Sequence, residues 1–224
     1  MATAERLARA GRRIRETTAF VHLSGALPLG ALEPLRGRHP VGSFHPLQSF
    51  PEPRPPASLR GIVVAVDAST ALLRRRLAGL ARSVGARPRH VRDGERVLYH
   101  VAAVFASNYV DALLGEAVQL LKTAGWSEKE ATSGLLALTE GTLTSVRKRG
   151  VAAALTGPVR RGDSNTVEHH LAALSGLPVA DLYRMLGLIA LGIAVEAGLE
   201  PTAAERMQRA LTHQVAATRR RRRG

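Results

Sequence analysis

The chain has 224 residues, of which 45% are hydrophobic and 22% charged, a balance typical of a globular protein with one or two domains. It contains no cysteine, which excludes disulfide scaffolds, thiolate zinc sites, iron–sulfur clusters and cysteine nucleophiles. Aromatic residues make up only 4%, which disfavours a platform for stacking single-stranded bases. No apolar run resembles a signal peptide or a charge-free membrane span, so we expect a cytoplasmic protein without membrane contact.

The formal net charge is +14, and five of the positive charges form an arginine run at residues 219–223. A strongly basic chain can bind nucleic acid, which is one alternative function for this protein. Almost all its basic residues are arginines, however, and the chain is rich in alanine, which indicates compositional bias instead of selection for phosphate contacts. We therefore expect no nucleic-acid partner and predict a disordered tail at residues 219–224.

The first part of the chain alternates helices with short strands. Helices are predicted over residues 1–14, 29–35 and 70–84, the last one capped by Asp67 or Ser69. Strands are predicted at residues 19–23 (buried), 41–44, 61–66 and 87–91 (a weak edge strand). Five of the 12 prolines fall within residues 46–56, which therefore form neither a helix nor a central strand. Such alternation predicts a mainly parallel sheet.

The second part of the chain is helical throughout. Helices are predicted over residues 97–124, 127–149, 164–174, 179–197 and 202–217, with a loop at 152–163. Ser127 and Glu130 have the spacing of a capping box. Residues 97–124 and 182–197 are apolar around most of the helix circumference, so they must be buried, in part against a second subunit. We predict an α/β domain over residues 1–92 and a helical domain over 93–218.

Polar residues on the predicted helix at 97–124 are the first candidates for a site. At about 100° per residue, Ser107 lies about 20° from His100 around the helix, and Asn108 lies at the margin of that face. A polar stripe on an apolar helix is either a satisfied core network or a functional site. His45 ends a predicted strand, where it can transfer a proton or simply bond a local carbonyl.

The loop before the helix at 164–174 supplies a second set of candidates. Arg161 is able to bind a carboxylate in a bidentate manner, whereas Asp163 has the position of a helix cap. His169 and His170 are adjacent and point about 100° apart on a helix, so they cannot hold one metal ion together. We predict no metal site. Phosphate-loop, zinc-protease and nucleophile-elbow motifs are all absent from the sequence.

Four segments together resemble a Rossmann-like oxidoreductase family with a C-terminal helical domain of unknown function. They are residues 22–26 (HLSGA), 42–50 (GSFHPLQSF), 99–109 (YHVAAVFASNY) and 154–163 (ALTGPVRRGD). The family is similar in layout to pyrroline-5-carboxylate reductase and 6-phosphogluconate dehydrogenase. The resemblance implies a partial Rossmann-like sheet followed by a helical dimerisation domain of the 6-phosphogluconate dehydrogenase C-terminal type, and hence a homodimer.

The resemblance also implies roles for individual residues. Ser24, Gly25 and His45 would face the nicotinamide end of NAD or NADP, and His100, Ser107 and Asn108 would be catalytic, with His100 donating a proton. Thr156, Arg161 and Asp163 would contact a small-molecule substrate, which would be a carbonyl compound, an imine or a hydroxy acid.

The sequence departs from this family at its start. Too few residues precede the first strand to form the strand, glycine-rich turn and helix that grip a dinucleotide, and Gly11 is the only glycine among them. We therefore expect an N-terminally truncated NAD(P)-dependent oxidoreductase with weak or no cofactor binding. A non-enzymatic dimeric helical module is the other alternative that the sequence leaves open.

Overall fold

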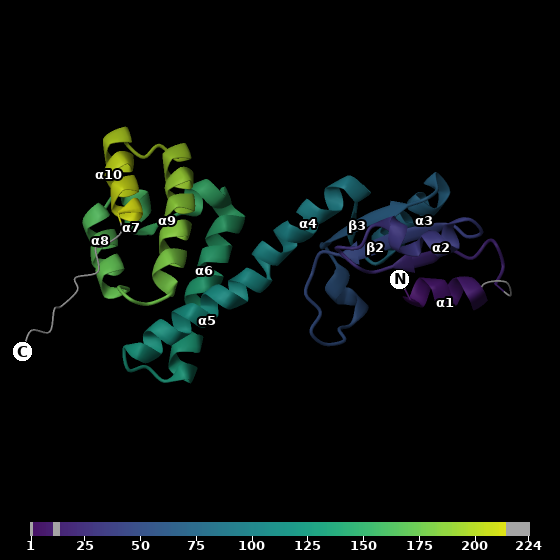
Figure 1. Cartoon of the computed structure of the whole chain (residues 1–224), viewed down its shortest axis with the longest axis horizontal. Coiled ribbons are helices and arrows are strands. Elements are labelled where there is room, and N and C mark those ends of the chain that lie inside the picture. The colour runs from purple at the N-terminus through teal and green to yellow at the C-terminus, as the bar shows by residue number, and fades with distance from the viewer. Residues whose placement is uncertain (1, 11–13, 214–224) are drawn as a thin grey trace, which may run out of the picture. The chain divides into compact units, whose positions relative to one another are not determined.

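A computed structural model describes residues 2–10 and 14–213 of the chain. The chain divides into two compact units, Met1–Ala112 and Leu113–Gly224 (Figure 1). The first is an α/β unit and the second consists of helices, which confirms the predicted fold class. The boundary predicted at residues 92 and 93 stays a prediction, and the arginine run at 219–223 lies outside the described residues.

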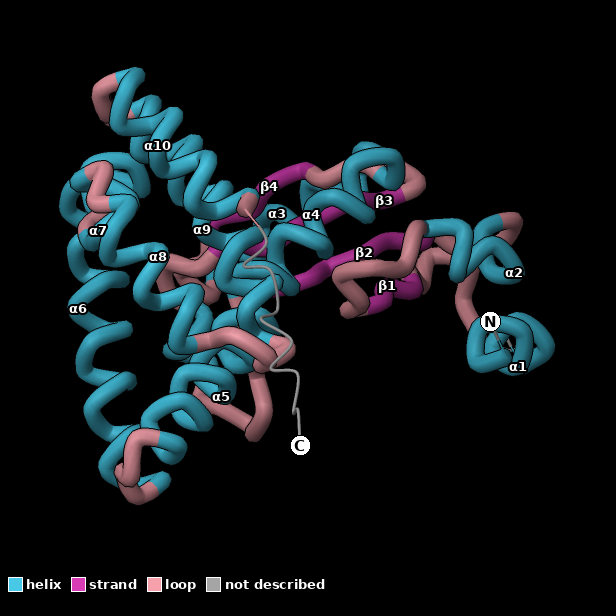
Figure 2. The backbone as a smooth tube through the Cα atoms, turned by 60° about the vertical axis from the view of Figure 1, so that its left-hand side comes forward, coloured by secondary structure: helices cyan, strands magenta, loops and turns pink. Residues whose placement is uncertain are grey.

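The α/β unit is built on a four-stranded sheet with the order β1-β2-β3-β4 (Figure 2). The strands are β1 (Phe20–His22), β2 (Val41–Pro46), β3 (Val63–Ala68) and β4 (Arg87–His90). β1 is parallel to β2 and β3 is parallel to β4, but β2 and β3 are antiparallel. Two of the three pairings are thus parallel, as the prediction of a mainly parallel sheet has it, but the antiparallel pairing in the middle, which was not predicted, makes the sheet mixed. The proline-rich segment after β2 forms no crossover helix, so the chain turns back beside the strand it has just left.

Short helices complete the α/β unit. They are α1 (Ala2–Ala10), η2 (Leu29–Leu32), α2 (Glu33–Arg36), η3 (Pro56–Leu59), α3 (Ala71–Ser83) and α4 (Asp93–Ala106). Thr70, and neither Asp67 nor Ser69, caps α3, because its hydroxyl accepts the N–H of Leu73 at 3.2 Å. The Ser69 hydroxyl instead accepts the N–H of Val41 and joins the end of β3 to the start of β2.

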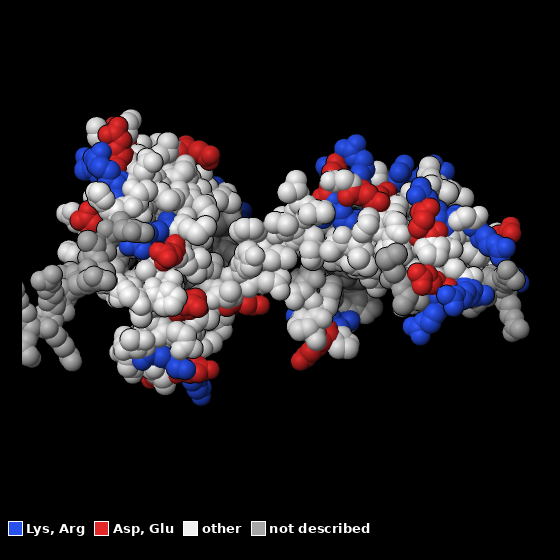
Figure 3. All heavy atoms as spheres, in the orientation of Figure 1, with Lys and Arg blue, Asp and Glu red and all other residues white. Residues whose placement is uncertain are grey.

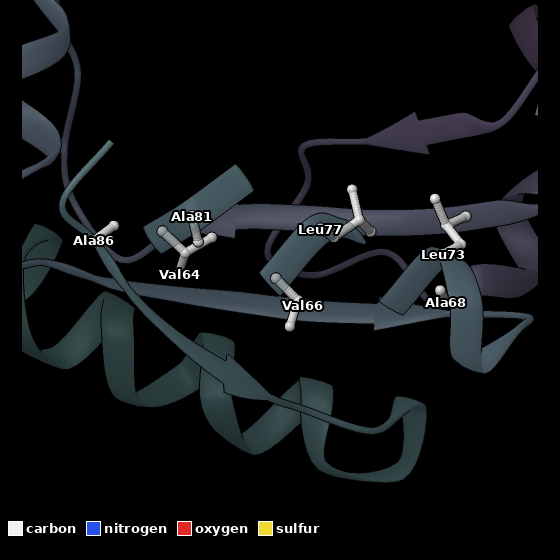
Figure 4. Packing of buried hydrophobic residues seen from close by; sticks show 7 residues of the cluster. All are labelled: Val64, Val66, Ala68, Leu73, Leu77, Ala81 and Ala86. Atoms are coloured by element: carbon white, nitrogen blue, oxygen red, sulfur yellow. The ribbon is translucent and has the colours of Figure 1, made fainter. Parts of the chain in front are cut away.

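The main core of this unit lies between β3 and α3. Valines and alanines of the strand pack on Leu73, Leu77 and Ala81 of the helix, which recur at a spacing of four residues (Figure 4). β1 is not the buried strand that the sequence predicted, since Val21 is 37% exposed and β1 lies at the edge of the sheet. A strand at the edge pairs on one side only and leaves more of its surface to solvent.

The helical unit contains most of α5 (Asn108–Thr123) and the helices after it. These are α6 (Glu128–Ala154), α7 (Gly157–Arg161), α8 (Ser164–Ala173), α9 (Val179–Glu196) and α10 (Pro201–Thr212). The Ser127–Glu130 capping box is present at the start of α6. α6 continues into the predicted loop across a kink at Gly150, whose φ of 78° is a conformation that only glycine adopts readily.

The core of the helical unit is formed by α8, α9 and α10. Val167 and Leu171 of α8 pack with Leu191 of α9 and with Met207 and Leu211 of α10. The predicted loop at 152–163 also contains the short helix α7, which the sequence analysis missed. Gly157 and Pro158 suggested only a turn there, although proline is well tolerated in the first turn of a helix.

The helix predicted over residues 97–124 is interrupted. Ser107 has non-helical angles (φ −127°, ψ −76°), and its carbonyl accepts the N–H groups of Val110 and Asp111 as α5 begins. Serine and asparagine side chains compete for backbone hydrogen bonds, which favours a break at the Ser107–Asn108 pair. The helical angle computed between His100 and Ser107 therefore does not apply.

Together, α4 and α5 form a segment, Asp93–Thr123, long and apolar enough by composition to cross a membrane. The sequence analysis missed it because it required a stretch without any charge, and Asp111 lies inside. Many of its apolar side chains are exposed, including Leu98 (75%) and Phe105 (59%). On the visible face, the C-terminal half of α4 carries almost no charged residues (Figure 3).

Candidate active site

A hollow of about 570 Å³ lies in the α/β unit, between the segment after β2 and the exposed side of α4. One side is lined by His45 of β2 and by Leu47, Gln48 and Ser49 of the segment after it. From the α4 side it is lined by Tyr99, His100, Ala102, Ala103, Val104, Ala106, Ser107 and Asn108. Four residues predicted from the sequence, His45, His100, Ser107 and Asn108, are thus brought together at one hollow. None of its lining residues is acidic.

A histidine–tyrosine pair forms part of the wall. The Nδ1 atom of His45 lies 2.7 Å from the hydroxyl of Tyr99, and the two rings meet edge to face with centroids 5.6 Å apart. His45 ends β2 and Tyr99 lies in the second turn of α4, so the pair connects the sheet to the helix. Depending on the tautomer of His45, the tyrosine either donates its proton to the ring or keeps it for another acceptor.

His100 approaches the same place from α4. A Cβ atom added to Gly25 would lie 2.9 Å from Nε2 of His45 and 3.0 Å from Nδ1 of His100. Both imidazoles therefore pack directly on the backbone of the turn after β1, and only glycine leaves room for them. The Nδ1 atom of His100 is buried and has no protein hydrogen-bond partner among the described residues.

A guanidinium lies one turn before Tyr99 on α4. Arg96 is 1% exposed, and its Nη2 donates a hydrogen bond of 2.6 Å to the hydroxyl of Ser43 in β2. Its Nε and Nη1 are buried without a hydrogen-bond partner, and Nε lies 3.6 Å from a carboxylate oxygen of Asp93. Arg96 therefore carries a permanent charge beside the hollow.

Burial and this charge lower the pKa of His45 and of His22 and favour their neutral forms. Burial lowers the pKa of His45 below its usual 6.5, and His100, Arg96 and His22 lower it further. The pKa of His22 is likewise lowered, first by burial and then by Arg96, against the opposing effects of Asp93 and the Pro28 carbonyl. Burial raises the pKa of Tyr99, while Arg96 acts in the opposite direction. At neutral pH the pair consists of uncharged His45 and a protonated tyrosine.

The remaining predicted residues lie elsewhere. The Ser24 hydroxyl accepts hydrogen bonds from the N–H groups of Ala26 and Leu27 and so stabilises the turn to which it belongs. Asp163 caps α8 as predicted, since its carboxylate accepts from the backbone N–H and the hydroxyl of Thr166. Thr156 and Arg161 flank and end α7 in the helical unit. Substrate contacts by Thr156, Arg161 and Asp163 stay predictions.

Sequence reasoning missed Tyr99, Arg96 and His22 as members of this cluster. A signal for two of them was present, because Arg96, Tyr99 and His100 are spaced by three and four residues and share one helix face. Nothing in the sequence indicated that His22 and Ser43, on neighbouring strands, would face that helix. Their pairing in the sheet register reveals it, since His22 and Ser43 are partners across β1 and β2.

Comparison with known proteins agrees with this architecture. The family described as "Domain of unknown function (DUF2520)" matches residues 62–190, more than half of the chain. The chain belongs to the DUF2520 family. No curated protein matches it.

Two solved structures are similar over most of the chain. One is described as "putative NADP oxidoreductase BF3122 from Bacteroides fragilis"; it is 27% identical, with a TM-score of 0.70, covering 85% of this chain and 71% of that one. The other is protein TM1727 from Thermotoga maritima, 26% identical with a TM-score of 0.67, covering 79% of this chain and 68% of that one. This DUF2520 member therefore has a Rossmann-like, oxidoreductase-like fold.

Proposed function

We propose that this protein is an NAD(P)-dependent oxidoreductase that acts on a small carbonyl compound, imine or hydroxy acid at the hollow beside α4. The observation that carries the proposal is the meeting of His45, Tyr99 and His100 against Gly25 at the wall of that hollow. Reduction of a carbonyl or imine needs a proton at the heteroatom, and a protonated imidazole or a phenol can donate one. The likeness to a protein described as a putative NADP oxidoreductase supports this reaction class.

The chain's own residues divide the work as follows. His100 donates the proton to the substrate heteroatom, and Ser107 and Asn108, at the other end of the lining, orient the substrate by hydrogen bonds. Alanines at positions 102, 103 and 106 keep this part of the wall small and apolar, which leaves room for the substrate. On the strength of the family resemblance alone, Thr156, Arg161 and Asp163 of the helical unit are proposed as further substrate contacts.

The described residues fit only one end of a nicotinamide cofactor. Ser24, Gly25 and His45 would hold the nicotinamide, beside the imidazoles of His45 and His100, which pack on the backbone of Gly25 at the turn after β1. Of these three residues, His45 lines the hollow. When bound, the cofactor supplies or accepts the hydride. Before β1, the described residues contain the helix α1 but no strand with a glycine-rich turn, so we assign no diphosphate site to them.

Turnover tests this proposal directly. The absorbance of NADPH or NADH is followed with panels of 2-oxo acids, aldehydes and cyclic imines, and with hydroxy acids in the reverse direction. We expect His100→Gln to lower turnover by about 10²- to 10⁴-fold, the usual contribution of a general acid. His170→Gln, which alters a histidine of the helical unit, is the matched control and leaves turnover unchanged. Absence of turnover with every panel member would contradict the proposal.

A titration with the cofactor alone tests its binding. Because the described residues before β1 contain no strand with a glycine-rich turn to bind the diphosphate, we expect this chain to bind NADPH weakly, well above micromolar concentrations, as measured by calorimetry. Micromolar affinity would contradict this expectation.

We place the protein in the cytoplasm as a soluble protein, on the strength of the oxidoreductase-like fold.

A homodimer formed through the helical unit is the second part of the proposal. α9 exposes a stripe of apolar side chains at helical spacing, with Leu182 at 38%, Met185 at 65% and Ile189 at 58% exposure. An apolar stripe this long on a globular protein marks an interaction site, and a second copy offers the same uncharged surface in return. The same stripe would support a non-enzymatic dimeric module if turnover is absent.

Solution mass decides between monomer and dimer. Light scattering is expected to give twice the chain mass of 23.9 kDa. Ile189→Glu, which places a charge in the stripe, is expected to yield the monomer, whereas Leu80→Glu on the exposed side of α3 (53% exposed) leaves the dimer intact. A monomeric unaltered protein would refute the proposed dimer.

A further inference from the structure

Arg96 carries a buried charge that the protein does not fully neutralise. Only 1% of the residue is exposed, and of its three guanidinium nitrogens Nη2 alone has a hydrogen-bond partner, the uncharged hydroxyl of Ser43. A buried guanidinium normally has a carboxylate in bidentate contact, because an isolated charge in the interior is costly. The chain thus maintains a positive charge at this position without the usual counter-charge.

Asp93 does not fill that role. Its nearest oxygen lies 3.6 Å from Nε of Arg96, beyond hydrogen-bonding distance, and its side chain is 44% exposed. Both of its carboxylate oxygens accept the N–H of Leu29 instead, at 3.0 and 3.2 Å. Asp93 therefore fixes the segment before η2 and compensates the guanidinium only in part.

The partly compensated charge of Arg96 lies one helical turn before two residues that line the hollow. Tyr99 and His100 follow Arg96 by three and four residues on the same helix face, and both line the hollow. Arg96 also influences the titration of His45 and Tyr99, which form the wall between it and the hollow. The lining contains no carboxylate, and its amide, hydroxyl and imidazole groups include several hydrogen-bond donors.

We propose that the hollow binds a small carboxylate anion, with the buried charge of Arg96 attracting it through the His45–Tyr99 wall. This inference names the substrate class of the proposed oxidoreductase. Binding of the anion does not depend on that function, but the statement that the anion is a substrate does. Of the classes left open above, it selects 2-oxo and hydroxy acids over uncharged aldehydes and imines.

The size of the effect follows from Coulomb's law. For a carboxylate about 8 to 12 Å from the guanidinium, at an effective dielectric constant of about 20, the attraction corresponds to a preference of roughly ten- to thirty-fold. Because the charge is buried, added salt screens it much less than it screens the surface arginines. Weak dependence on ionic strength therefore distinguishes Arg96 from the general attraction exerted by a chain of net charge +14.

The first experiment needs no variant. The unaltered full chain, labelled with ¹⁵N and ¹³C and without cofactor, is titrated with pyruvate and with pyruvamide, which share a carbon skeleton but differ in charge. We expect the imidazole signals of His45 and His100 to shift with both, with a Kd at least about ten-fold lower for pyruvate. Equal affinity for the two probes overturns the inference. A pyruvate affinity that collapses between low and high salt also overturns it.

Two variants then locate the charge. Arg96→Gln is expected to reduce pyruvate affinity to the level of pyruvamide. Arg92→Gln removes an exposed guanidinium (73% exposed) next to the start of the same helix and is expected to change nothing. Equal losses in both variants contradict a specific role of Arg96. If Arg96→Gln fails to fold, the comparison of pyruvate with pyruvamide still decides the matter.

Inorganic phosphate completes the set of probes. Phosphate is an anion of different shape. If phosphate binds as tightly as pyruvate and shifts the same imidazole signals, the hollow does not select carboxylates and the inference is overturned. Failure of the inference is separable from failure of the proposed function. Carboxylate binding without turnover of any acid contradicts only the oxidoreductase, whereas turnover of uncharged carbonyls without preference for acids contradicts only this inference.

Discussion

The two units of the chain each contain a histidine–tyrosine pair of nearly the same geometry. In the α/β unit, His45 and Tyr99 lie 2.7 Å apart with rings at 89°. In the helical unit, His170 of α8 and Tyr183 of α9 lie 2.8 Å apart with rings at 85°. Distances and angles alone therefore do not distinguish a site from a structural contact.

The surroundings of the two pairs differ. His45 is half-buried, packs on Gly25 and stands between a hollow and the buried charge of Arg96. His170 is exposed, and the hydroxyl of Tyr183 joins two helices that already share an apolar core. A buried charge and a nearby cavity give the first pair a chemical environment that the second lacks, and this contrast is what mutations can test.

The largest expected effect concerns the core that supports the second pair. Leu171→Ala removes a 2% exposed side chain from the core of α8, α9 and α10, and we expect it to lower the free energy of unfolding by about 2–5 kcal/mol. The single tryptophan, Trp126, belongs to the helical unit, so its fluorescence follows this loss in a denaturant titration. The pyruvate affinity of the α/β unit, in contrast, should remain. A change below about 1 kcal/mol would contradict the packing described here.

Gly25→Ala is expected to displace the His45 ring of the His45–Tyr99 pair, because this ring packs on Gly25. The added Cβ would lie 2.7 Å from Cε1 of His45, a distance that forces the ring to move and costs about 1–3 kcal/mol of stability. We expect the imidazole signals of His45 and His100 to shift in NMR spectra while those of His170 stay in place. Gly30→Ala, where a Cβ meets nothing within 4 Å, is the matched control and leaves all three signals unchanged.

Part of the fold and of the candidate site could be predicted from the sequence. The alternation of short strands and helices, the edge position of β4 and the helical second half followed from hydrophobic periodicity and from proline and glycine. The resemblance assigned His45, His100, Ser107 and Asn108 to one site, whereas the helical spacing used for His100, Ser107 and Asn108 assumed an unbroken helix that the structure does not have. The antiparallel pairing of β2 with β3 was not predictable, because it depends on how the proline-rich segment folds back.

The partners of Arg96 were equally beyond the sequence. An arginine near the start of a helix is usually solvated, and nothing local indicates that Arg96 turns toward Ser43 of β2. The break at Ser107 also went unnoticed, since a serine on an apolar helix is compatible with an unbroken helix. In each case tertiary contacts, which no local pattern encodes, decided the outcome.

Removing one hydroxyl from each pair compares them directly. Tyr99→Phe leaves Nδ1 of His45 without its partner in a partly buried setting, and we expect a loss of about 0.5–1.5 kcal/mol in denaturant titrations. Tyr183→Phe leaves the exposed His170 free to bond water, so the loss should be close to zero. Equal losses in the two variants would show that the surroundings of the pairs do not differ in the way we describe.

The smallest expected effect is a dependence on pH. Burial, His100 and Arg96 hold the pKa of folded His45 below the value of 6.5 that it has when exposed, so the unfolded chain binds a proton first as the pH falls. Its contribution to stability is complete above about pH 6.5 and declines as the pH falls from there to the folded pKa. The exposed half of the ring weakens this effect by solvent screening. NMR titration of the Cε1 proton should place the His45 pKa below 6.5 and, because Arg96→Gln removes one of the depressing charges, higher in that variant than in the unaltered protein. A His45 pKa above 6.5 in the unaltered protein would contradict both the burial of the ring and the influence of the Arg96 charge, and with them the contrast drawn between the two pairs.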